Sequence, residues 1–369
     1  MPESLKNFFD PVVVRRLATM LRAAWPSFPE SRFVAEASEG LKSHELLGRA
    51  RHIMHAMHRA LPSDFERAAD ILERSLGPVL ERLEGQGMAV FLYLPHTLYV
   101  AEHGLDHFET SMRLQHALTQ RFTAEFSIRP FLERHPRETL ACLRQWASEP
   151  NVHVRRLVSE GTRPRLPWAS RLRAFQEDPR PVLELLELLK DDPELYVRRS
   201  VANNLNDIGK DHPELLVETC ERWSQDATPE RQWVIRHALR SAVKRGDARA
   251  LAVLGFRGAS SLEVTASFRP GRIRLGESVS VSLSVSNRSG KRQRAVVDLA
   301  VHFIKANGSA RPKVFKGGTV DLPPGASGML EKTVSFAELT TRRHYAGEHR
   351  VEALVNGRPV ELGSFTVLG

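Results

Sequence analysis

Residues 151–168, NVHVRRLVSEGTRPRLPW, decide the fold that we expect for this chain. Apolar residues recur at positions i, i+3, i+4 and i+7 from Val154 to Gly161, which is the spacing of one buried helical face. Gly161 is suited to end that helix. The loop that follows contains two prolines, which restrict its backbone, and it ends on the indole of Trp168. The stretch therefore predicts a helix followed by a stiff loop that presents an aromatic side chain.

The same pattern recurs along the chain. The sequence RFTAE at 121–125 matches RLVSE at 156–160, and looser copies occur at 196–203 and 234–240. A repeat of about 40 residues with two helices in each unit is typical of HEAT-like solenoids, whose second helices line one concave surface. We therefore predict an all-α HEAT-like repeat solenoid. The equivalent positions of the four copies, 35, 43 and 37 residues apart, are Glu125, Glu160, Asn203 and Arg240.

Polar side chains step by four along each of these second helices, so each set lies on one helical face. We expect the four sets to lie side by side on the concave surface. They are Arg121 with Glu125, Arg156 with Glu160, Arg199 with Asn203 and Asp207, and Arg236 with Arg240 and Lys244.

After about residue 258 the apolar period changes from 3.6 to 2. Residues 255–261 predict a linker, and SVSVSLSVS at 278–286 alternates strictly, as a strand with one buried face does. Further strands are expected to follow, separated by Asn-Gly and Pro-Pro-Gly turns. About seven short strands in roughly 110 residues predict an immunoglobulin-like (Ig-like) β-sandwich. The expected domains are therefore 1–257 and 258–369.

The charge of the chain is uneven. Its net charge is +9, yet residues 259–369 carry 16 Lys and Arg against 9 Asp and Glu, whereas residues 1–258 carry 37 against 35. A basic C-terminal domain favours a polyanionic partner, although solubility alone would also explain it.

Other patterns predict a chain without cofactors. Cys142 and Cys220 occur in apolar helical runs and are expected to be reduced core thiols. His52, His55 and His58 recur every third residue, but they fan around the expected helix without an acidic partner, so we predict no metal site. We find no signal peptide or long apolar run, and we expect a soluble, cytoplasmic monomer with no membrane partner.

Glutamates from successive repeats, an aspartate and an indole on a stiff loop would face one groove, with Arg163 and Arg165 at its rim. On spacing alone, an exposed i,i+4 ion pair is the simpler interpretation of each Arg–Glu pair. Trp168 taken alone would more often belong to a core. Convergence of these side chains on one surface favours a functional site.

Acidic side chains and an indole favour a cation, whereas a basic rim favours phosphates. Alkylated DNA combines the two, because N3-methyladenine and N3-methylcytosine are cationic bases in a polyanionic chain. Hydrolysis of their N-glycosidic bond passes through an oxocarbenium-like sugar, which carboxylates can stabilise while one of them holds the attacking water.

The segments VRRLVSEGTRPRLPW at 154–168 and VRRSVANNLND at 197–207 resemble the HEAT-like-repeat DNA alkylation repair glycosylases, specifically their AlkC branch. The resemblance covers about residues 1–255, with SEGTRPRLPW as its most specific run. The predicted sandwich is similar to the Ig-like domain appended in a subset of AlkC proteins.

The resemblance implies a monofunctional DNA glycosylase of base excision repair that removes 3-methyladenine and 3-methylcytosine from double-stranded DNA without a metal or cofactor. It implies that Glu125, Glu160, Trp168 and Asp207 are catalytic, and that the DNA is bent without full flipping of the base. The alternative is a non-catalytic scaffold that binds DNA or protein. The expected DNA-binding residues are Arg155, Arg156, Arg163, Arg165, Arg199, Arg236, Arg240, Lys244, Arg342 and Arg343.

Overall fold

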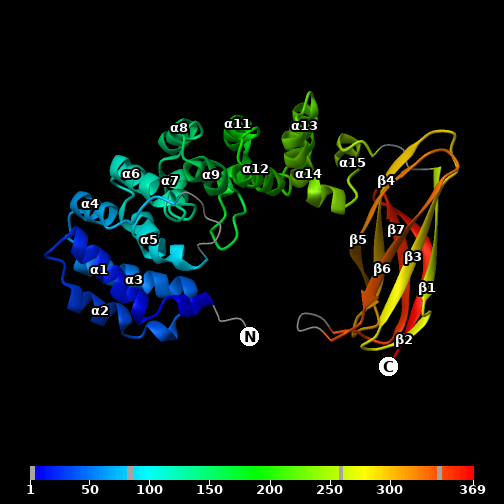
Figure 1. Cartoon of the computed structure of the whole chain (residues 1–369), viewed down its shortest axis with the longest axis horizontal. Helices are drawn as coiled ribbons and strands as arrows, with labels where there is room; N and C mark the ends of the chain where they lie inside the picture. Colours follow the sequence, from blue (N-terminus) through cyan, green and yellow to red (C-terminus); the bar gives the residue numbers. More distant parts are fainter. Residues whose placement is uncertain (1–4, 81–86, 257–260, 339–342) are drawn as a thin grey trace. The chain divides into compact units, whose positions relative to one another are not determined.

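The computed structural model describes residues 5–80, 87–256, 261–338 and 343–369 of the chain. It divides into two compact units, Met1–Asp211 and His212–Gly369. The first unit is helical, and the second contains three helices followed by the strands of a β-sandwich (Figure 1). The predicted fold class, a helical-repeat region followed by an Ig-like sandwich, is confirmed. The predicted boundary between 257 and 258 lies outside the described residues and stays a prediction.

The first unit is built from helices joined by short turns. Its N-terminal helices share one apolar core that includes Phe9, Leu17 and Phe33, all fully buried. Three short 3-10 helices, η1 (Leu5–Phe8), η2 (Leu41–Ser43) and η3 (Ala89–Tyr93), accompany the α-helices. The α-helices are α1 (Pro11–Ala24), α2 (Glu30–Ser38), α3 (Leu46–Ala60), α4 (Phe65–Arg74), α5 (Leu94–His103), α6 (Phe108–Thr119), α7 (Ile128–Arg134), α8 (Pro136–Trp146), α9 (Val152–Gly161), α10 (Arg173–Glu177), α11 (Arg180–Leu189) and α12 (Leu195–Ile208).

Two patterns in this unit predict a structure that differs from the one observed. Residues 86–100, with Pro95 inside an aromatic and aliphatic run, predict an irregular segment, but the proline lies in the first turn of α5, where its missing N–H has no helical acceptor to lose. The match of residues 121–125 to the helical segment 156–160 predicts a helix from Thr123, but the chain from 120 to 127 forms turns, and α7 begins at Ile128. Glu125 therefore lies in a turn rather than on a helical face.

Helix α9 confirms the prediction for residues 151–161. Its N-terminus is capped by Asn151, whose side chain accepts hydrogen bonds from the backbone N–H groups of His153 and Val154. Val154 and Leu157 are fully buried on the face that was expected to be apolar. A Cβ atom added at Gly161 would lie 2.6 Å from Cγ2 of Ile128, so the missing side chain lets α7 approach α9.

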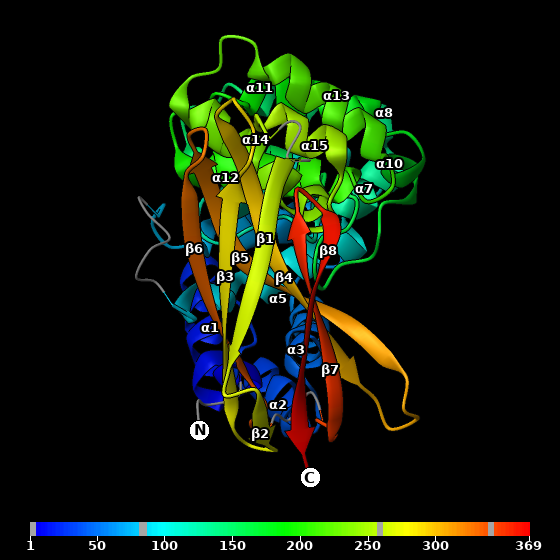
Figure 2. The ribbon, with the colours of Figure 1, turned by 90° about the vertical axis from the view of Figure 1, so that its right-hand side faces the viewer.

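The second unit joins helices α13 (Pro213–Ser224), α14 (Pro229–Lys244) and α15 (Ala248–Val253) to a sandwich of two sheets. Figure 2 shows strands β6, β3 and β1 of one sheet side by side. The other sheet has the order β2-β8-β7-β4-β5. The strands are β1 (Leu262–Arg269), β2 (Arg272–Arg274), β3 (Ser278–Asn287), β4 (Gln293–Ile304), β5 (Ala310–Leu322), β6 (Ser327–Ser335), β7 (Gly347–Val355) and β8 (Arg358–Leu368).

A sandwich without cysteine has to rely on an apolar core, and aliphatic and aromatic side chains fill the space between the sheets. The alternation in β3 places Val279, Val281 and Leu283 inside, each no more than 1% exposed. Strand β1 pairs with β3 along its whole length, although its weaker alternation escaped the sequence analysis.

Helices and sandwich meet within the second unit at two glycines. Gly246 follows α14 and Gly357 lies in the turn between β7 and β8, and both have a positive φ, 76° and 77°. A Cβ atom at Gly246 would lie 2.6 Å from Cα of Gly357. Two backbones can approach this closely only where neither residue has a side chain.

No helix among the described residues is long and apolar enough to cross a membrane. Neither cysteine forms a disulfide. Burial raises the pKa of Cys142 to about 11 and that of Cys220 to about 12, so both thiols are protonated at neutral pH.

The contact between Gly161 and Ile128 predicts a stability effect. Gly161→Ala should lower the free energy of unfolding by about 1–2 kcal/mol, because overpacking exceeds the gain in helix propensity. Urea denaturation monitored by circular dichroism measures the shift in midpoint. The double variant Gly161→Ala, Ile128→Ala should be less stable than Ile128→Ala by a smaller margin, since the obstructing methyl group is gone. An unchanged midpoint in Gly161→Ala would contradict the close packing.

Candidate active site

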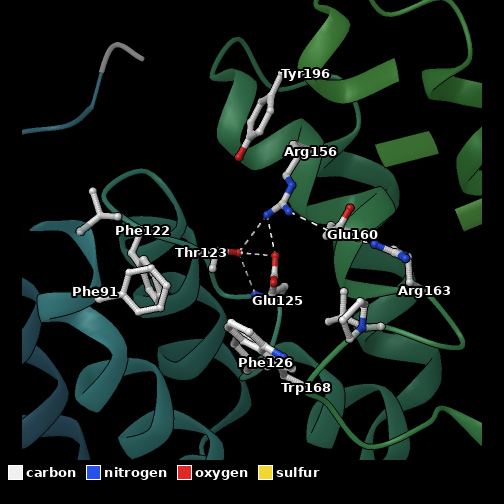
Figure 3. A pocket seen from close by; sticks show the side chains of 13 residues that line it. Phe91, Phe122, Thr123, Glu125, Phe126, Arg156, Glu160, Arg163, Trp168 and Tyr196 are labelled. Atoms are coloured by element: carbon white, nitrogen blue, oxygen red, sulfur yellow. Dashed lines mark hydrogen bonds and ion pairs between the residues drawn. The ribbon is translucent and has the colours of Figure 1, made fainter. Parts of the chain in front are cut away.

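A hollow of about 460 Å³ opens in the first unit where η3, the turn before α7, helix α9 and the start of α12 meet (Figure 3). One part of its wall is aromatic and aliphatic, and the other part is charged. The lining residues are Val90, Phe91, Phe122, Thr123, Glu125, Phe126, Arg156, Glu160, Arg163, Leu166, Pro167, Trp168 and Tyr196.

Arg156 lies between the two glutamates of the hollow (Figure 3). Its Nη1 donates a hydrogen bond of 2.6 Å to Oε2 of Glu125, and its Nη2 is 3.5 Å from Oε1 of Glu160. The predicted i,i+4 pair of Arg121 with Glu125 is wrong, because the turn at 120–127 directs Arg121 to the carbonyl oxygens of Gly77 and Ala117. The guanidinium that pairs with Glu125 comes instead from the next repeat.

Glu160 is 6% exposed, and both of its carboxylate oxygens accept hydrogen bonds. Its Oε1 accepts a hydrogen bond of 2.6 Å from Nη1 of Arg163, and its Oε2 accepts one of 2.6 Å from Oγ of Ser200 on α12. Burial raises the pKa of this carboxyl, but Arg156, Arg163 and the Ser200 hydroxyl together outweigh burial and lower it below 4.5. Glu160 is therefore an anion at neutral pH.

Asp207 lies behind Arg163 rather than in the wall of the hollow. It is 1% exposed, and its Oδ2 accepts a hydrogen bond of 2.9 Å from Nε of Arg163. Lys210, which is 41% exposed, donates to the other carboxylate oxygen over 2.7 Å. Arg163 thus bridges Glu160 and Asp207, two carboxylates that the sequence analysis placed together.

Trp168 stands at the edge of the hollow on the loop that follows α9. Its side chain is 65% exposed and its backbone φ is +65°, a left-handed conformation that is rare for a bulky residue. The two arginines expected at the rim are buried or partly buried instead. Arg163 is 9% exposed and lines the hollow, whereas Arg165 pairs with Asp211, so neither is an exposed cation at the rim.

The other predicted DNA-binding residues lie in varied surroundings. Arg155 pairs with Asp192 over 2.6 Å and donates to two backbone carbonyl oxygens, which leaves little of it exposed. The residues Arg199, Arg236, Arg240, Lys244 and Arg343 are exposed. Arg342 lies outside the described residues.

The sequence analysis missed the aromatic part of the site. Tyr196 lies in the first turn of α12, and its ring centroid lies 5.4 Å from the Arg156 guanidinium carbon. Phe91 and Phe122 pack against each other with ring centroids 5.2 Å apart. Apolar spacing does not distinguish such residues from core, so only proximity to the glutamates reveals them.

The described part of the chain contains no group of three His, Cys, Asp or Glu side chains placed to hold a metal ion. The three histidines of α3 diverge, as their spacing predicted. His52 contacts the backbone oxygen of Glu36, His55 lies 3.7 Å from Glu102, and His58 stacks on His103.

Comparisons with known proteins agree with this architecture. A family model described as DNA alkylation repair enzyme matches residues 118–244, which contain the hollow's glutamates and α12. A second model, described as the C-terminal Ig-like domain of the uncharacterised protein YhaZ, matches residues 263–369.

Two full-length relatives extend the match. The uncharacterized protein YhaZ of Bacillus subtilis (strain 168) is 36% identical over 365 residues, which is 98% of this chain and 99% of the relative. The solved structure of Pseudomonas fluorescens alkylpurine DNA glycosylase AlkC, bound to DNA containing an abasic site analog, is 35% identical, covers 100% of both chains and superimposes with a TM-score of 0.88. This chain therefore belongs to the AlkC-type family of DNA alkylation repair proteins and has the fold of an alkylpurine DNA glycosylase with a C-terminal Ig-like domain.

Proposed function

We propose that the protein hydrolyses the N-glycosidic bond of cationic alkylated bases, 3-methyladenine and 3-methylcytosine, in double-stranded DNA. The observation that carries the proposal is the hollow in which Glu125 and Glu160 flank Arg156 beside the exposed indole of Trp168. Similarity to an alkylpurine DNA glycosylase supports the reaction class.

The reaction exchanges one bond at the sugar for another. The bond between C1′ and the base nitrogen breaks, and its electron pair leaves with the base, which departs neutral because it was cationic. The sugar becomes oxocarbenium-like, a water oxygen bonds to C1′, and the water proton passes to a carboxylate and then to solvent. No general acid is needed for such a leaving group.

The carboxylates act in this proposal as fixed anions. Glu160 is held ionised by two guanidiniums, and Arg163 ties it to Asp207, so the negative charge is in place before the sugar becomes positive. One of the two glutamates holds the water and stabilises the sugar, and Asp207, buried behind Arg163, adds its negative charge through that guanidinium. Trp168 contacts the sugar or the damaged base.

A non-catalytic scaffold is the alternative, and the burial of the site argues against it. Burying several charges carries a desolvation penalty, which the exposed charges of a scaffold would not incur. Glu160, Arg163 and Asp207 are all at least 91% buried, whereas a binding surface for phosphates would leave its arginines exposed.

The C-terminal unit contains a second hollow with a basic lining, and we propose that this hollow binds DNA. The hollow measures about 520 Å³ and contains a single acidic side chain, Asp298, among its lining residues. Its lining also includes apolar side chains, among them Phe256 and Val296. Its cations come from helix α14 and strand β5, and they are Arg236, Arg240, Lys244 and Lys316. Phosphates are the ligands that such a surface favours.

The catalytic assignment predicts the effect of neutralising the carboxylates. Glu160→Gln and Asp207→Asn should each lower the single-turnover rate of 3-methyladenine release by about 10²–10³-fold, because an electrostatic contact made in the transition state is lost. Glu184→Gln, a change at an exposed position of α11, is the matched control. Rates in both site variants equal to that of the control would refute the assignment.

Fixed anions should also select the charge of the substrate. The protein should excise cationic 3-methyladenine far faster than neutral uracil or 1,N6-ethenoadenine, since a neutral base leaves poorly without a general acid. Duplexes that differ only in the damaged base make this comparison. Comparable release of uracil would point to a different chemistry.

The basic hollow predicts a change in salt dependence. Lys244→Glu and Lys316→Glu should each weaken DNA binding and reduce the slope of log affinity against log salt by about one unit, the change for one phosphate contact. Lys305→Glu, in the turn at the far end of the β4–β5 hairpin, is the charge-matched control. If plots of log affinity against log salt for Lys244→Glu and Lys316→Glu both superimpose on the wild-type plot, the basic hollow has no role in DNA binding.

A further inference from the structure

We infer that Arg129 is a positioning residue that fixes the loop between α9 and α10 and thereby holds Trp168 at the edge of the hollow. The expected effect on catalysis rests on the proposed glycosylase function, whereas the expected effect on the loop does not.

Arg129 lies on α7 and bonds to both ends of the loop. Its Nη1 donates to the carbonyl oxygens of Gly161, over 3.1 Å, and Arg163, over 2.8 Å. Its Nη2 donates to the carbonyl oxygen of Ser170 over 2.5 Å. One planar guanidinium therefore joins the residues on either side of Trp168, a geometry that suits the fixed fork of arginine.

The surroundings of Arg129 are unusual for a cation. The residue is 2% exposed, and all three of its hydrogen bonds go to backbone carbonyl oxygens rather than to a carboxylate. Burial lowers its pKa to about 10, so it still carries its charge at neutral pH. Burying a cation of this kind lowers stability. Its hydrogen bonds to both ends of the loop fix the distance between those ends.

The indole has little else to hold it. Trp168 is 65% exposed and has a positive φ, so neither burial nor backbone preference fixes its position. Pro164 and Pro167 stiffen the loop, and a backbone hydrogen bond of 3.3 Å joins Leu172 N–H to the Pro164 oxygen. A stiff loop transmits the position of its ends to its tip, so the ends that Arg129 grips determine where the indole lies.

The same loop carries Arg163, the bridge between Glu160 and Asp207. Its backbone oxygen accepts from Arg129 while its side chain binds the carboxylates. Loss of the Arg129 fork should therefore disturb Trp168 and the carboxylates together. A displacement near 1 Å in such a site can cost about 10²-fold in rate.

The test compares Arg129→Met and Arg129→Lys with Arg134→Met, the same change at an exposed position of the same helix. Acrylamide quenching reports the indole directly, measured for each variant with and without Trp168→Phe so that the difference isolates Trp168. We expect greater quenching of Trp168 in Arg129→Met and no change in Arg134→Met. Arg129→Lys should recover only part of the effect, because one ammonium group cannot span both ends of the loop.

Single-turnover excision of 3-methyladenine separates positioning from folding. Arg129→Met should lower the maximal rate about 10- to 100-fold at 25 °C, below its thermal midpoint, with little change in the DNA concentration that gives half the maximal rate. In a Trp168→Ala background, Arg129→Met should cost less than it does alone, since the part of its effect that passes through the indole is already lost.

Three outcomes would overturn the inference. They are unchanged Trp168 quenching in Arg129→Met, rate losses that multiply fully in the double variant, and a rate that falls only in proportion to the unfolded fraction. If the wild-type protein excises no cationic base, the proposed function fails, but the quenching comparison still decides whether Arg129 positions the loop.

Discussion

The need of a buried carboxylate for a cationic partner governs this structure. Glu160 and Asp207 lie almost out of contact with water, where an unpaired charge would cost several kcal/mol. Each is paired with a guanidinium, and each guanidinium reaches two carboxylates. The result is a row of alternating charges, Glu125–Arg156–Glu160–Arg163–Asp207. The three inner members each pair with two neighbours in the row, and the two outer members each pair with one.

This row connects elements that are far apart in the sequence. Arg156 links the turn before α7 to α9, and Arg163 links the loop after α9 to α12. Behind it, Oγ of Ser159 donates to Oγ of Ser200, which donates to Glu160, so a hydrogen-bonded layer joins α9 and α12. The side chains that form the candidate active site thus also fix the positions of neighbouring repeats relative to one another.

Sequence patterns predicted some elements of this arrangement well and others poorly. The helix predicted within residues 151–161 is present, because its apolar spacing and its Asn151 cap favour the same structure. The turn at 120–127 was missed because RFTAE resembles the helical RLVSE, although the segment forms turns and α7 begins only at Ile128. Arg163 was expected at the rim, and its burial depends on pairing with Glu160, three residues before it, and with Asp207 from α12.

The sequence by itself determined that helices precede strands, that the sandwich has an aliphatic core, and that Glu125, Glu160, Asp207 and Trp168 deserved to be considered together. These follow from local periodicity and from a repeated motif. Only the tertiary structure decided which arginine pairs with which carboxylate, that Tyr196 and the phenylalanines complete the hollow, and that Arg129 grips the Trp168 loop. The physical reason is that an ion pair or a hydrogen bond depends on distance in space, and the chain brings together residues more than 30 positions apart only when its helices pack.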